Sequence, residues 1–239
     1  MVVCIVFGKI KMEKERRKVW FISDTHFTHP SILYFHPWRR DACGVTLEEL
    51  QDDKNAALEK HDKWLIDKWN STVRKCDEVY ILGDFCLGNR VKAEEILRQL
   101  KGRKHLITGN HDKSLKGLEN YFESVSQIKE VKFTNNQFKF IDPEETFCVE
   151  LCHFPMLTWN RRPHGTCHVH GHCHGGIDAW NKESKELRVD AGLDSDIFGH
   201  EFIEVEALYE YFKAIRDASG CKKFEEYQEW LMANQGFRM

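Results

Sequence analysis

Five short apolar runs along the chain predict buried β-strands. Each run is rich in Val, Ile, Phe and Tyr and spans only a few residues. Runs of this length and composition, bounded by polar or turn-forming residues, are typical of strands rather than helices. The predicted strands are Lys18–Ile22, Glu78–Leu82, Lys104–Thr108, Phe147–Cys152 and Cys167–His170.

A capping-box pattern predicts the start of a long helix between the first two runs. In Thr46–Glu49, the Thr side chain and the Glu three residues later can satisfy free backbone N–H groups of a first helical turn. Apolar residues follow at helical spacing, at Leu58, Leu65 and Trp69. We therefore expect one helix that ends at about Trp69.

The rest of the chain carries patterns for three more helices and a hairpin. Val91–Leu100 has helical spacing, and Gly102 beyond it is a typical helix stop. Val131–Ile141 alternates apolar and polar residues around an Asn-Asn pair, which predicts a β-hairpin. Two C-terminal helices are expected over Glu206–Ala218 and Phe224–Ala233.

The order of these elements favours an α/β domain. Strand, helix, strand, helix and strand come first and strand-rich sequence follows, which predicts a largely parallel first half. The 239 residues are 41% hydrophobic and 31% charged, an ordinary balance for a soluble globular protein. Length alone favours neither one large core nor two small ones.

Charge and apolar content weigh against two classes of partner. The formal net charge is −3 with histidine neutral, so the strongly basic surface of a protein that binds long nucleic acid is not expected. No apolar run is long enough to span a bilayer, and no membrane association is expected. The apolar start, residues 2–7, lacks the positive flank and the cleavage site of a signal peptide. Residues 1–11 are either an extra strand or a consequence of start-site choice.

Nine cysteines at irregular spacing favour reduced thiols and a cytoplasmic protein. Cys148, Cys152, Cys167 and Cys173 crowd the histidine-rich region, which leaves a structural zinc site open as an alternative. The chain has no C-x-x-C pair, the spacing typical of such sites, so this alternative is the weaker one.

Each predicted strand is followed by residues that can bind a metal or a phosphate. The runs end in Ser-Asp-Thr-His, Gly-Asp, Gly-Asn-His-Asp, a single His, and Gly-His-Cys-His. In open α/β sheets, ligands bind beyond the carboxyl ends of the strands, so the five ends are expected to converge on one site. The candidate metal ligands are Asp24, His26, Asp84, Asn110, His153, His172 and His174.

Spacing and ligand chemistry support a transition-metal site. In extended backbone, residues i and i+2 point to the same side, which would let Asp24 chelate with His26, and His172 with His174. A set of Asp, Asn and His suits Mn, Fe, Zn or Ni better than Ca. A lone Asp-x-His or a lone His153 is explained as well by turn chemistry. All five motifs in this order favour the metal site.

These motifs, taken in order, resemble the calcineurin-like metallophosphoesterase superfamily over about Lys18–Val205. Ser-Asp-Thr-His-Phe-x-His, with Trp-Asn ahead of the second strand, resembles its small bacterial and phage branch. The resemblance implies an α/β (α+β) fold, a four-layer sandwich of two mixed β-sheets flanked by helices. It also implies a single domain over residues 18–239 with C-terminal helices, preceded by an extension or extra strand over residues 1–17.

The resemblance further implies two divalent metal ions, with Mn expected first and Fe, Zn or Ni as alternatives. One ion would be held by Asp24, His26 and His174. The other would be held by Asn110, His153 and His172. Asp84 would bridge them, and His111 would face the scissile phosphate, so that Asp84 and His111 are the expected catalytic residues.

The expected reaction is hydrolysis of a small phosphate ester, with a phosphodiester of nucleotide type preferred. Two metals can activate a shared water as hydroxide, and His111 could give a proton to the leaving group. A phosphomonoesterase and a catalytically inactive metal-binding scaffold remain alternatives. Protein phosphatases of this superfamily carry an Asp and an Arg just after Gly-Asp, whereas this chain continues with Phe85–Gly88. A protein phosphatase is therefore the weaker interpretation.

Further residues are candidates for contacts with the substrate or the ligands. Arg39, Arg161, Arg162 and His29 could contact the phosphate, because a guanidinium binds it bidentately; exposed or packed roles are about as plausible. Trp38 and Trp159 could stack on a base or pack in the core. The other candidates are supporting ones, namely Asp112, which is equally well a helix-initiating acid, and His168 and His170, which are more simply strand residues.

Overall fold

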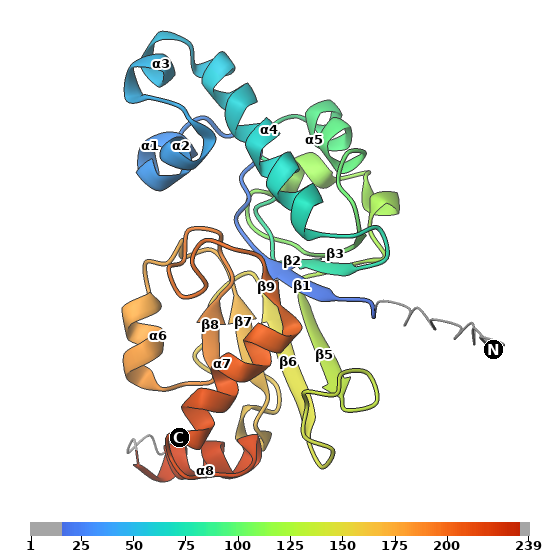
Figure 1. Ribbon diagram of the computed structural model, residues 1–239, viewed down its shortest axis with the longest axis vertical. Helices are drawn as coiled ribbons and strands as arrows, with labels where there is room; N and C mark the ends of the chain where they lie inside the picture. Colours follow the sequence, from blue (N-terminus) through green and yellow to red (C-terminus); the bar gives the residue numbers. More distant parts are fainter. Residues whose placement is uncertain (1–15, 235–239) are drawn as a thin grey trace, which may run out of the picture.

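The first three predicted strands lie side by side in a mixed five-stranded sheet (Figure 1). In the computed structural model, which describes residues 16–234, β1 to β4 of this sheet are parallel and β9 is antiparallel to β1. The order across the sheet is β4 (Ser124–Ser126), β3 (Arg103–Ile107), β2 (Glu78–Ile81), β1 (Val19–Ile22) and β9 (Ile203–Glu204).

A second mixed sheet contains the last two predicted strands. Its order is β5 (Ile128–Thr134), β6 (Thr146–Cys152), β7 (Cys167–His170) and β8 (Arg188–Asp190). β5 and β6 are antiparallel, and β6, β7 and β8 are parallel. Two mixed sheets with helices outside them confirm the predicted fold class.

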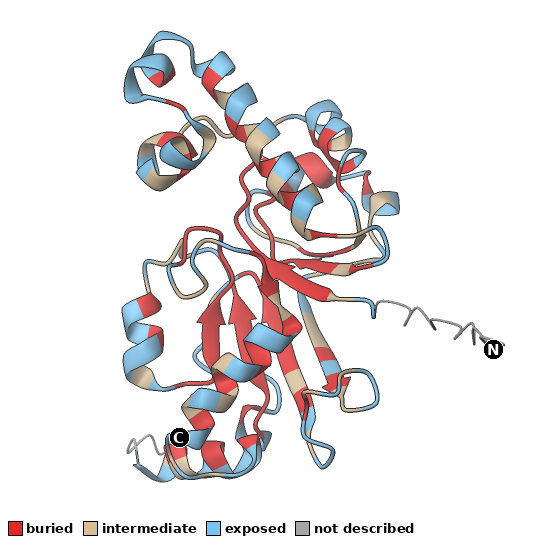
Figure 2. Cartoon of the chain, viewed as in Figure 1, coloured by how far each residue is buried: buried red, intermediate tan, exposed pale blue. Residues whose placement is uncertain are grey.

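The core lies on both faces of β1, because successive side chains of a strand point to opposite sides. Phe21 packs with Val149 and Val169 of the second sheet. Ile22 instead packs with Leu65 under α4 (Lys54–Thr72), which covers the outer face of the first sheet together with α5 (Arg90–Leu97). The central strands of both sheets are accordingly buried almost throughout, whereas the edge strands β4 and β5 are largely half-buried or exposed and the helices are buried along one side only (Figure 2).

The long helix predicted from Thr46 is two helices. The capping box is present, and it starts α3 (Leu47–Asp52). Asp53 has extended backbone, and its carboxylate accepts hydrogen bonds from the N–H groups of residues 55 and 56, so it starts α4 anew. The buried line along α4 is Ala57, His61, Leu65 and Trp69, while Leu58 is only half-buried.

The predicted hairpin is wrong in its second strand. β5 ends at Thr134, and its partner β6 begins at Thr146, which lies opposite Thr134 in the register. Residues 135–145 form a long connection, held where the Asn135 side chain donates to the carbonyl of Ile141. The C-terminal helices are confirmed as α7 (Val205–Asp217) and α8 (Phe224–Asn234), and the helix predicted over Val91–Leu100 as the shorter α5.

Several short elements escaped prediction because their sequences are too brief or too polar to show a period. The segment between β1 and α4 holds α1 (Ile32–Phe35) and α2 (Pro37–Cys43), which pack on their own small apolar cluster. The others are α6 (Asp178–Ser184), the 3₁₀ turns Asp112–Leu115, Glu119–Tyr121 and Arg162–His164, and strands β4, β8 and β9.

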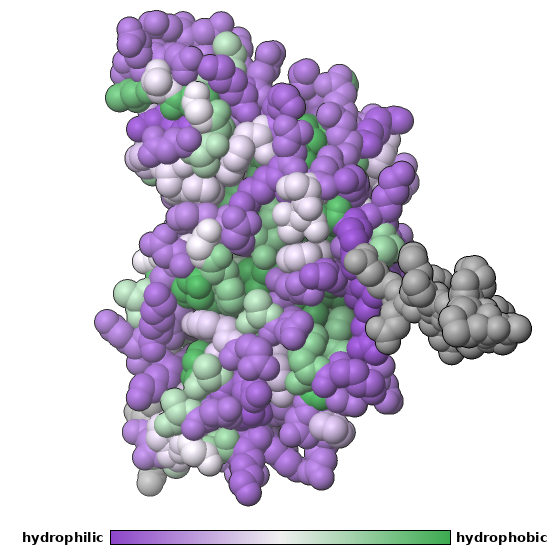
Figure 3. Space-filling model, viewed as in Figure 1, coloured by the Kyte–Doolittle hydropathy of each residue, from purple (hydrophilic) through white to green (hydrophobic). Residues whose placement is uncertain are grey.

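None of the helices within residues 16–234 combines the length and apolar character needed to cross a membrane. The expectation of an extra strand in residues 1–11 lies outside the described residues. Figure 3 shows hydrophobic surface gathered near the middle of the view, where the two halves of the molecule meet, and hydrophilic surface over the outer helices.

Candidate metal centre

The two sheets are joined at their carboxyl ends, and this junction gathers the predicted motifs. The N–H of Ser23, just after β1, donates to Ala191 O at 2.9 Å, and the N–H of Leu193 donates to Ser23 O at 3.1 Å. Residues that follow β1, β2 and β3 therefore meet those that follow β6, β7 and β8. The convergence expected for parallel strands occurs here, between two sheets rather than within one.

A first group of potential ligands consists of Asp24, His26 and His174, whose ligand atoms all lie within 4.8 Å of one another. The Oδ1 atom of Asp24 is 3.7 Å from Nε2 of His26 and 3.7 Å from Nε2 of His174. Asp24 is fully buried and His26 is 3% exposed. This group can hold one divalent ion at the floor of the site.

A second group consists of Asp84, His153 and His172, with ligand atoms again within 4.8 Å of one another. The side-chain oxygen of Asn110 lies 3.1 Å from Nε2 of His153 and so joins this group. Oδ2 of Asp84 is 3.5 Å from Nε2 of His153 and 3.7 Å from Nε2 of His26. One carboxylate oxygen thus faces both groups.

Unpaired buried atoms fit the presence of metal in the first group. Oδ1 of Asp24 and both ring nitrogens of His26 are buried and have no hydrogen-bond partner within the protein. A buried polar atom without a partner costs on the order of 1–3 kcal/mol. A divalent ion coordinated by Oδ1 of Asp24 and by Nε2 of His26 would remove that cost for these two atoms, and a donor set of carboxylate and imidazole suits Mn, Fe or Zn.

The backbone of the ligand residues is not extended, so the predicted geometry of the i, i+2 pairs is wrong. Asp24 and His26 have φ of 55° and 49°, and His172 and His174 have φ of 70° and 48°. Asp84, at 50°, shares this left-handed conformation, which costs a non-glycine residue on the order of 1–3 kcal/mol and persists only where surrounding structure imposes it. The paired side chains converge because the chain coils tightly, not because a strand continues.

Backbone hydrogen bonds beyond the strand ends impose this conformation. The N–H groups of Asp24 and His26 donate to the carbonyls of Gly83 and Asp84 at 3.1 and 3.0 Å. Gly171 must lack a side chain here, because a Cβ would overlap Ser23 Oγ. The loops after β1, β2 and β7 therefore hold one another in place.

Electrostatics keep the two central carboxylates ionised. Burial alone would raise the pKa of Asp84, but hydrogen bonding to His153 and to the N–H of His111 outweighs it and lowers the pKa to about 2. Burial would also raise the pKa of Asp24. A hydrogen bond from His26 and the nearby charge of His174 outweigh burial, so the pKa of Asp24 is lowered. Both carboxylates are therefore available to bind cations at neutral pH.

Residues 17–204 match the calcineurin-like phosphoesterase family. The chain belongs to this family. An uncharacterised protein of Methanocaldococcus jannaschii is 38% identical over 99 residues, which are 41% of this chain and only about half, 48%, of that protein. The Gene 66 proteins of Mycobacterium phage L5 and Mycobacterium phage D29 are 28% and 25% identical, over 68% and 83% of this chain and 87% and 98% of theirs.

The phage relatives agree with the resemblance to the bacterial and phage branch. A crystal structure of a protein of unknown function from Aquifex aeolicus superposes with a TM-score of 0.56. That protein is 21% identical, and the match covers 82% of this chain and all of the other, which shows a shared fold.

The phosphoesterase surrounds its ligands with a second layer that sequence reasoning missed. Asp194 accepts from His174 Nδ1 at 2.6 Å and so directs Nε2 toward Asp24. Asp194 is itself held by Arg39 through two bonds, Nε to Oδ1 at 2.7 Å and Nη2 to Oδ2 at 2.8 Å. Arg39 also donates to the carbonyls of Asp24 and Thr25.

Arg39 therefore does not have the predicted role of a phosphate contact. It lies in α2 and is 0% exposed. Its guanidinium is occupied by Asp194 and by backbone carbonyls, so it positions a ligand instead of contacting substrate. Trp38 is a supporting residue too, since its indole N–H donates to Asp194 at 2.8 Å.

Asp112 connects the loops after β2 and β3. Its carboxylate accepts from the N–H groups of Asp84, Phe85 and Gly109 at 3.1, 2.8 and 2.7 Å. It also begins a 3₁₀ turn, so both interpretations of this residue hold. On the second sheet, Nδ1 of His153 lies 2.7 Å from the carbonyl of Leu82, which leaves Nε2 facing the metal centre.

The histidines inside β7 are structural. His168 and His170 are fully buried, and burial lowers their pKa values to about 4 and about 3. Nδ1 of His168 lies 3.0 Å from Glu150 O, and its Nε2 accepts from the N–H of Met156. Both residues act as neutral hydrogen-bonding groups of the core.

Arg161 and Arg162 lie at the wrong end of the second sheet for substrate contact. The 3₁₀ turn Arg162–His164 comes before β7, whose opposite end carries His172. Arg162 is buried and forms a bidentate pair with Glu186. Their short separation from His153 in sequence was misleading, because the intervening chain runs back along the sheet. Trp159 packs there too and is buried.

Two histidines remain at the mouth of the site. The His29 ring centroid is 5.2 Å from that of His26, and burial, then His26, lowers the pKa of His29 to about 4. His111 is exposed, and its ring centroid is 5.9 Å from that of His26. Its backbone N–H donates to Asp84 Oδ1 at 2.8 Å, which fixes the loop that carries it.

The missed Asp194 had a signal in the sequence. It follows the short strand β8, at whose start Leu187 and Val189 are apolar but Arg188 interrupts the run and so hides it. Within residues 16–234, none of the potential ligand groups contains a cysteine, which removes support for the zinc alternative.

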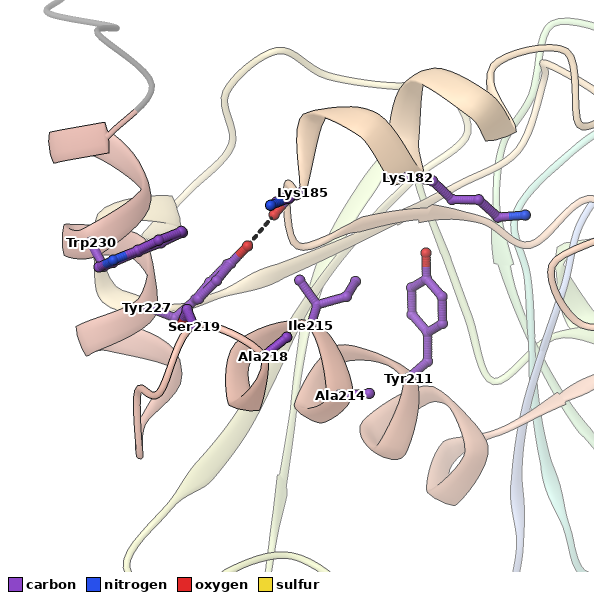
Figure 4. Close-up of a pocket in the computed structure, with 9 residues that line it drawn as sticks. All are labelled: Lys182, Lys185, Tyr211, Ala214, Ile215, Ala218, Ser219, Tyr227 and Trp230. Carbon is purple, nitrogen blue, oxygen red and sulfur yellow. Dashed lines mark hydrogen bonds between the residues drawn. The ribbon is translucent and has the colours of Figure 1, made fainter.

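A cavity of about 410 Å³ between α6, α7 and α8 shares no residue with the metal centre (Figure 4).

Proposed function

We propose that this metal-dependent phosphoesterase hydrolyses a phosphodiester of nucleotide type at a pair of divalent ions. The observation that carries the proposal is the position of Asp84, whose Oδ2 faces His26 of one ligand group and His153 of the other. A carboxylate shared in this way is what a two-metal centre requires. Manganese is the preferred ion, with Fe, Zn or Ni as alternatives.

Asp24, His26 and His174 would hold one ion, and Asn110, His153 and His172 the other. When bound, a metal pair supplies an activated water nucleophile and neutralises charge on the phosphoryl oxygens. The chain's own residues orient the side chains that would bind these ions. The carbonyl of Leu82 and the carboxylate of Asp194 each fix one imidazole, through His153 Nδ1 and His174 Nδ1.

His111 is the proposed general acid. Its exposed ring stands at the mouth, and its backbone is tied to Asp84. An alkoxide is a poor leaving group and needs a proton as the ester bond breaks, which a positioned imidazolium can donate. His29, beside His26, is proposed to contact the phosphate as a neutral hydrogen-bonding group.

The placement of the arginines supports a diester over a monoester. A phosphomonoester carries two negative charges near neutral pH, and enzymes that bind such groups commonly use arginine. Arg39 is occupied within the protein, and Arg162 is paired at the far end of the second sheet. A singly charged diester makes less demand for added positive charge.

A substrate pair and metal analysis test this function. We expect the purified protein with Mn²⁺ to bind two ions per chain and to hydrolyse bis(p-nitrophenyl) phosphate faster than p-nitrophenyl phosphate. Preference for the monoester would make the protein a phosphomonoesterase. Two bound ions without turnover of either ester would support the scaffold alternative.

We also propose a reducing, cytoplasmic location, since the eight cysteines among residues 16–234 are all free.

A further inference from the structure

An aromatic side chain stands exposed at the edge of the metal centre. Phe154 directly follows His153 and is 44% exposed. Its ring centroid lies 4.8 Å from that of His172 and 4.9 Å from that of His153, edge to face with both. Phe154 is therefore in contact with two of the proposed ligands, and both Phe154 and His172 are exposed to solvent.

The loop that carries Phe154 is firmly anchored, so this exposure does not come from loose structure. The N–H of Met156 donates to Nε2 of the buried His168 at 3.2 Å, and its carbonyl accepts from Nη1 of the buried Arg188 at 2.9 Å. Further along the same segment, the indole N–H of Trp159 donates to Thr166 O at 2.6 Å. The loop is thus held against polar residues of β7 and β8.

Two further exposed apolar residues lie near Phe154 in the chain or in the strand register. Leu157, on the same anchored loop, is 78% exposed. Ile128, at the start of β5, is 51% exposed and pairs with Cys152, two residues before Phe154. Apolar surface held rigidly at the rim of a binding site is typical of ligand recognition rather than of ordinary surface.

We infer that Phe154 is the platform on which the aromatic base of the substrate's ester group stacks. The inference rests on the proposed function, because the metal centre fixes the phosphate and the ester arm must then cross the rim. A rigid ring loses little conformational entropy on contact, and stacking tolerates any base because each has a π-face. An edge-to-face contact with both imidazoles holds the Phe154 ring in one orientation.

Calorimetric binding of two matched probes to the Mn²⁺-loaded full chain tests this platform. Adenosine monophosphate and ribose 5-phosphate share the phosphate and the ribose and differ at C1, where the nucleotide carries adenine and the sugar phosphate carries a hydroxyl group. We expect the wild-type chain to bind the nucleotide more tightly. Phe154→Ala should reduce the ratio of the two affinities by about 5- to 150-fold, the range for loss of one base–aromatic stack. Phe154→Trp should preserve the ratio.

The ratio separates stacking from a structural role toward His172. If Phe154 only supported its neighbour His172, the affinities for both probes would fall by the same factor and the content of bound manganese would fall. That result would overturn the inference. Equal affinity of the wild-type chain for both probes would also overturn it. So would a Phe154→Ala variant that loses affinity for hexyl phosphate, an apolar ligand without a ring, by the same factor as for adenosine monophosphate. Val125→Ala, at an exposed residue on the edge strand β4, is the matched control and should leave the ratio unchanged.

Two features keep this test independent of folding and of turnover. Phe154→Leu keeps the apolar bulk, so it measures the ratio even if the alanine variant does not fold, and a ratio equal to that of wild type would contradict stacking. Binding is read without hydrolysis. Failure of every diester as a substrate would therefore overturn the proposed function, whereas the affinity ratio alone decides the platform.

Discussion

Replacement of Arg39 by methionine should cost this phosphoesterase both stability and metal affinity. The Arg39 side chain is 0% exposed and forms two short bonds with the equally buried Asp194. Methionine fills similar volume but leaves the Asp194 carboxylate without its cation. Removal of one partner from a buried ion pair typically costs about 3–5 kcal/mol, so we expect a loss of this size in the free energy of unfolding.

The loss of metal affinity follows from the next contact in the chain of interactions. Asp194 fixes His174 through Nδ1 at 2.6 Å, and Arg39 in turn fixes Asp194. Disturbance of such supporting partners commonly lowers metal affinity by about 10- to 100-fold. Urea unfolding of the metal-free protein measures the first effect, and titration with Mn²⁺ measures the second.

Arg162→Met is the matched control for this experiment. Arg162 also forms a bidentate pair, with Glu186 at 2.6 and 3.1 Å, but it lies remote from the metal ligands. The Arg162→Met protein should therefore be less stable than wild type and should keep its affinity for manganese. Adding Asp194→Leu to Arg39→Met should recover part of the lost stability, because the unpaired charge is gone. An Arg39→Met protein within about 1 kcal/mol of wild type would refute the reasoning, since it would mean that the pair is not truly buried.

Three further predictions concern other parts of the molecule. Asp84→Asn should lose metal from both positions and lose activity; retention of two ions per chain, by elemental analysis, would argue against a bridge. His111→Asn should keep its metal and lose on the order of 10²–10⁴-fold on a diester with an alkoxide leaving group, but far less on a nitrophenyl ester, as steady-state rates would show. Arg74, the N–H of Lys18 and Trp20 outweigh burial and hold the pKa of Asp77 at about 2, so its ionisation contributes stability above pH 4 that is lost as the pH falls toward 2. Urea unfolding should therefore show Asp77→Asn less stable than wild type by about 2 kcal/mol at neutral pH, with the gap closing in that acidic window; a gap independent of pH would show that the carboxylate charge is not responsible.

Sequence patterns served well where a single stretch of chain carries its own information. The buried strands β1, β2, β3, β6 and β7 were predicted from local apolar runs, because a strand covered on both faces needs apolar residues in succession. The capping box at Thr46 was likewise visible, since its two hydrogen bonds join residues three apart. Strands β4, β8 and β9 are too short to show a period, and β9 pairs with β1 from the far end of the chain.

The sequence by itself determined which residue types stand after each strand, and hence the family and the candidate ligands. Their left-handed backbone did not follow from it, because the N–H groups of Asp24 and His172 are tied to other loops, to Gly83 O and to the Asp24 carboxylate respectively. The roles of the arginines were decided only by tertiary structure. Arg39 finds its partner 155 positions away in Asp194, whereas Arg162, near His153 in sequence, is carried to the far end of the sheet. Sequence separation does not measure distance in a folded chain, so a charge can be assigned to a site only once its counter-charge is located.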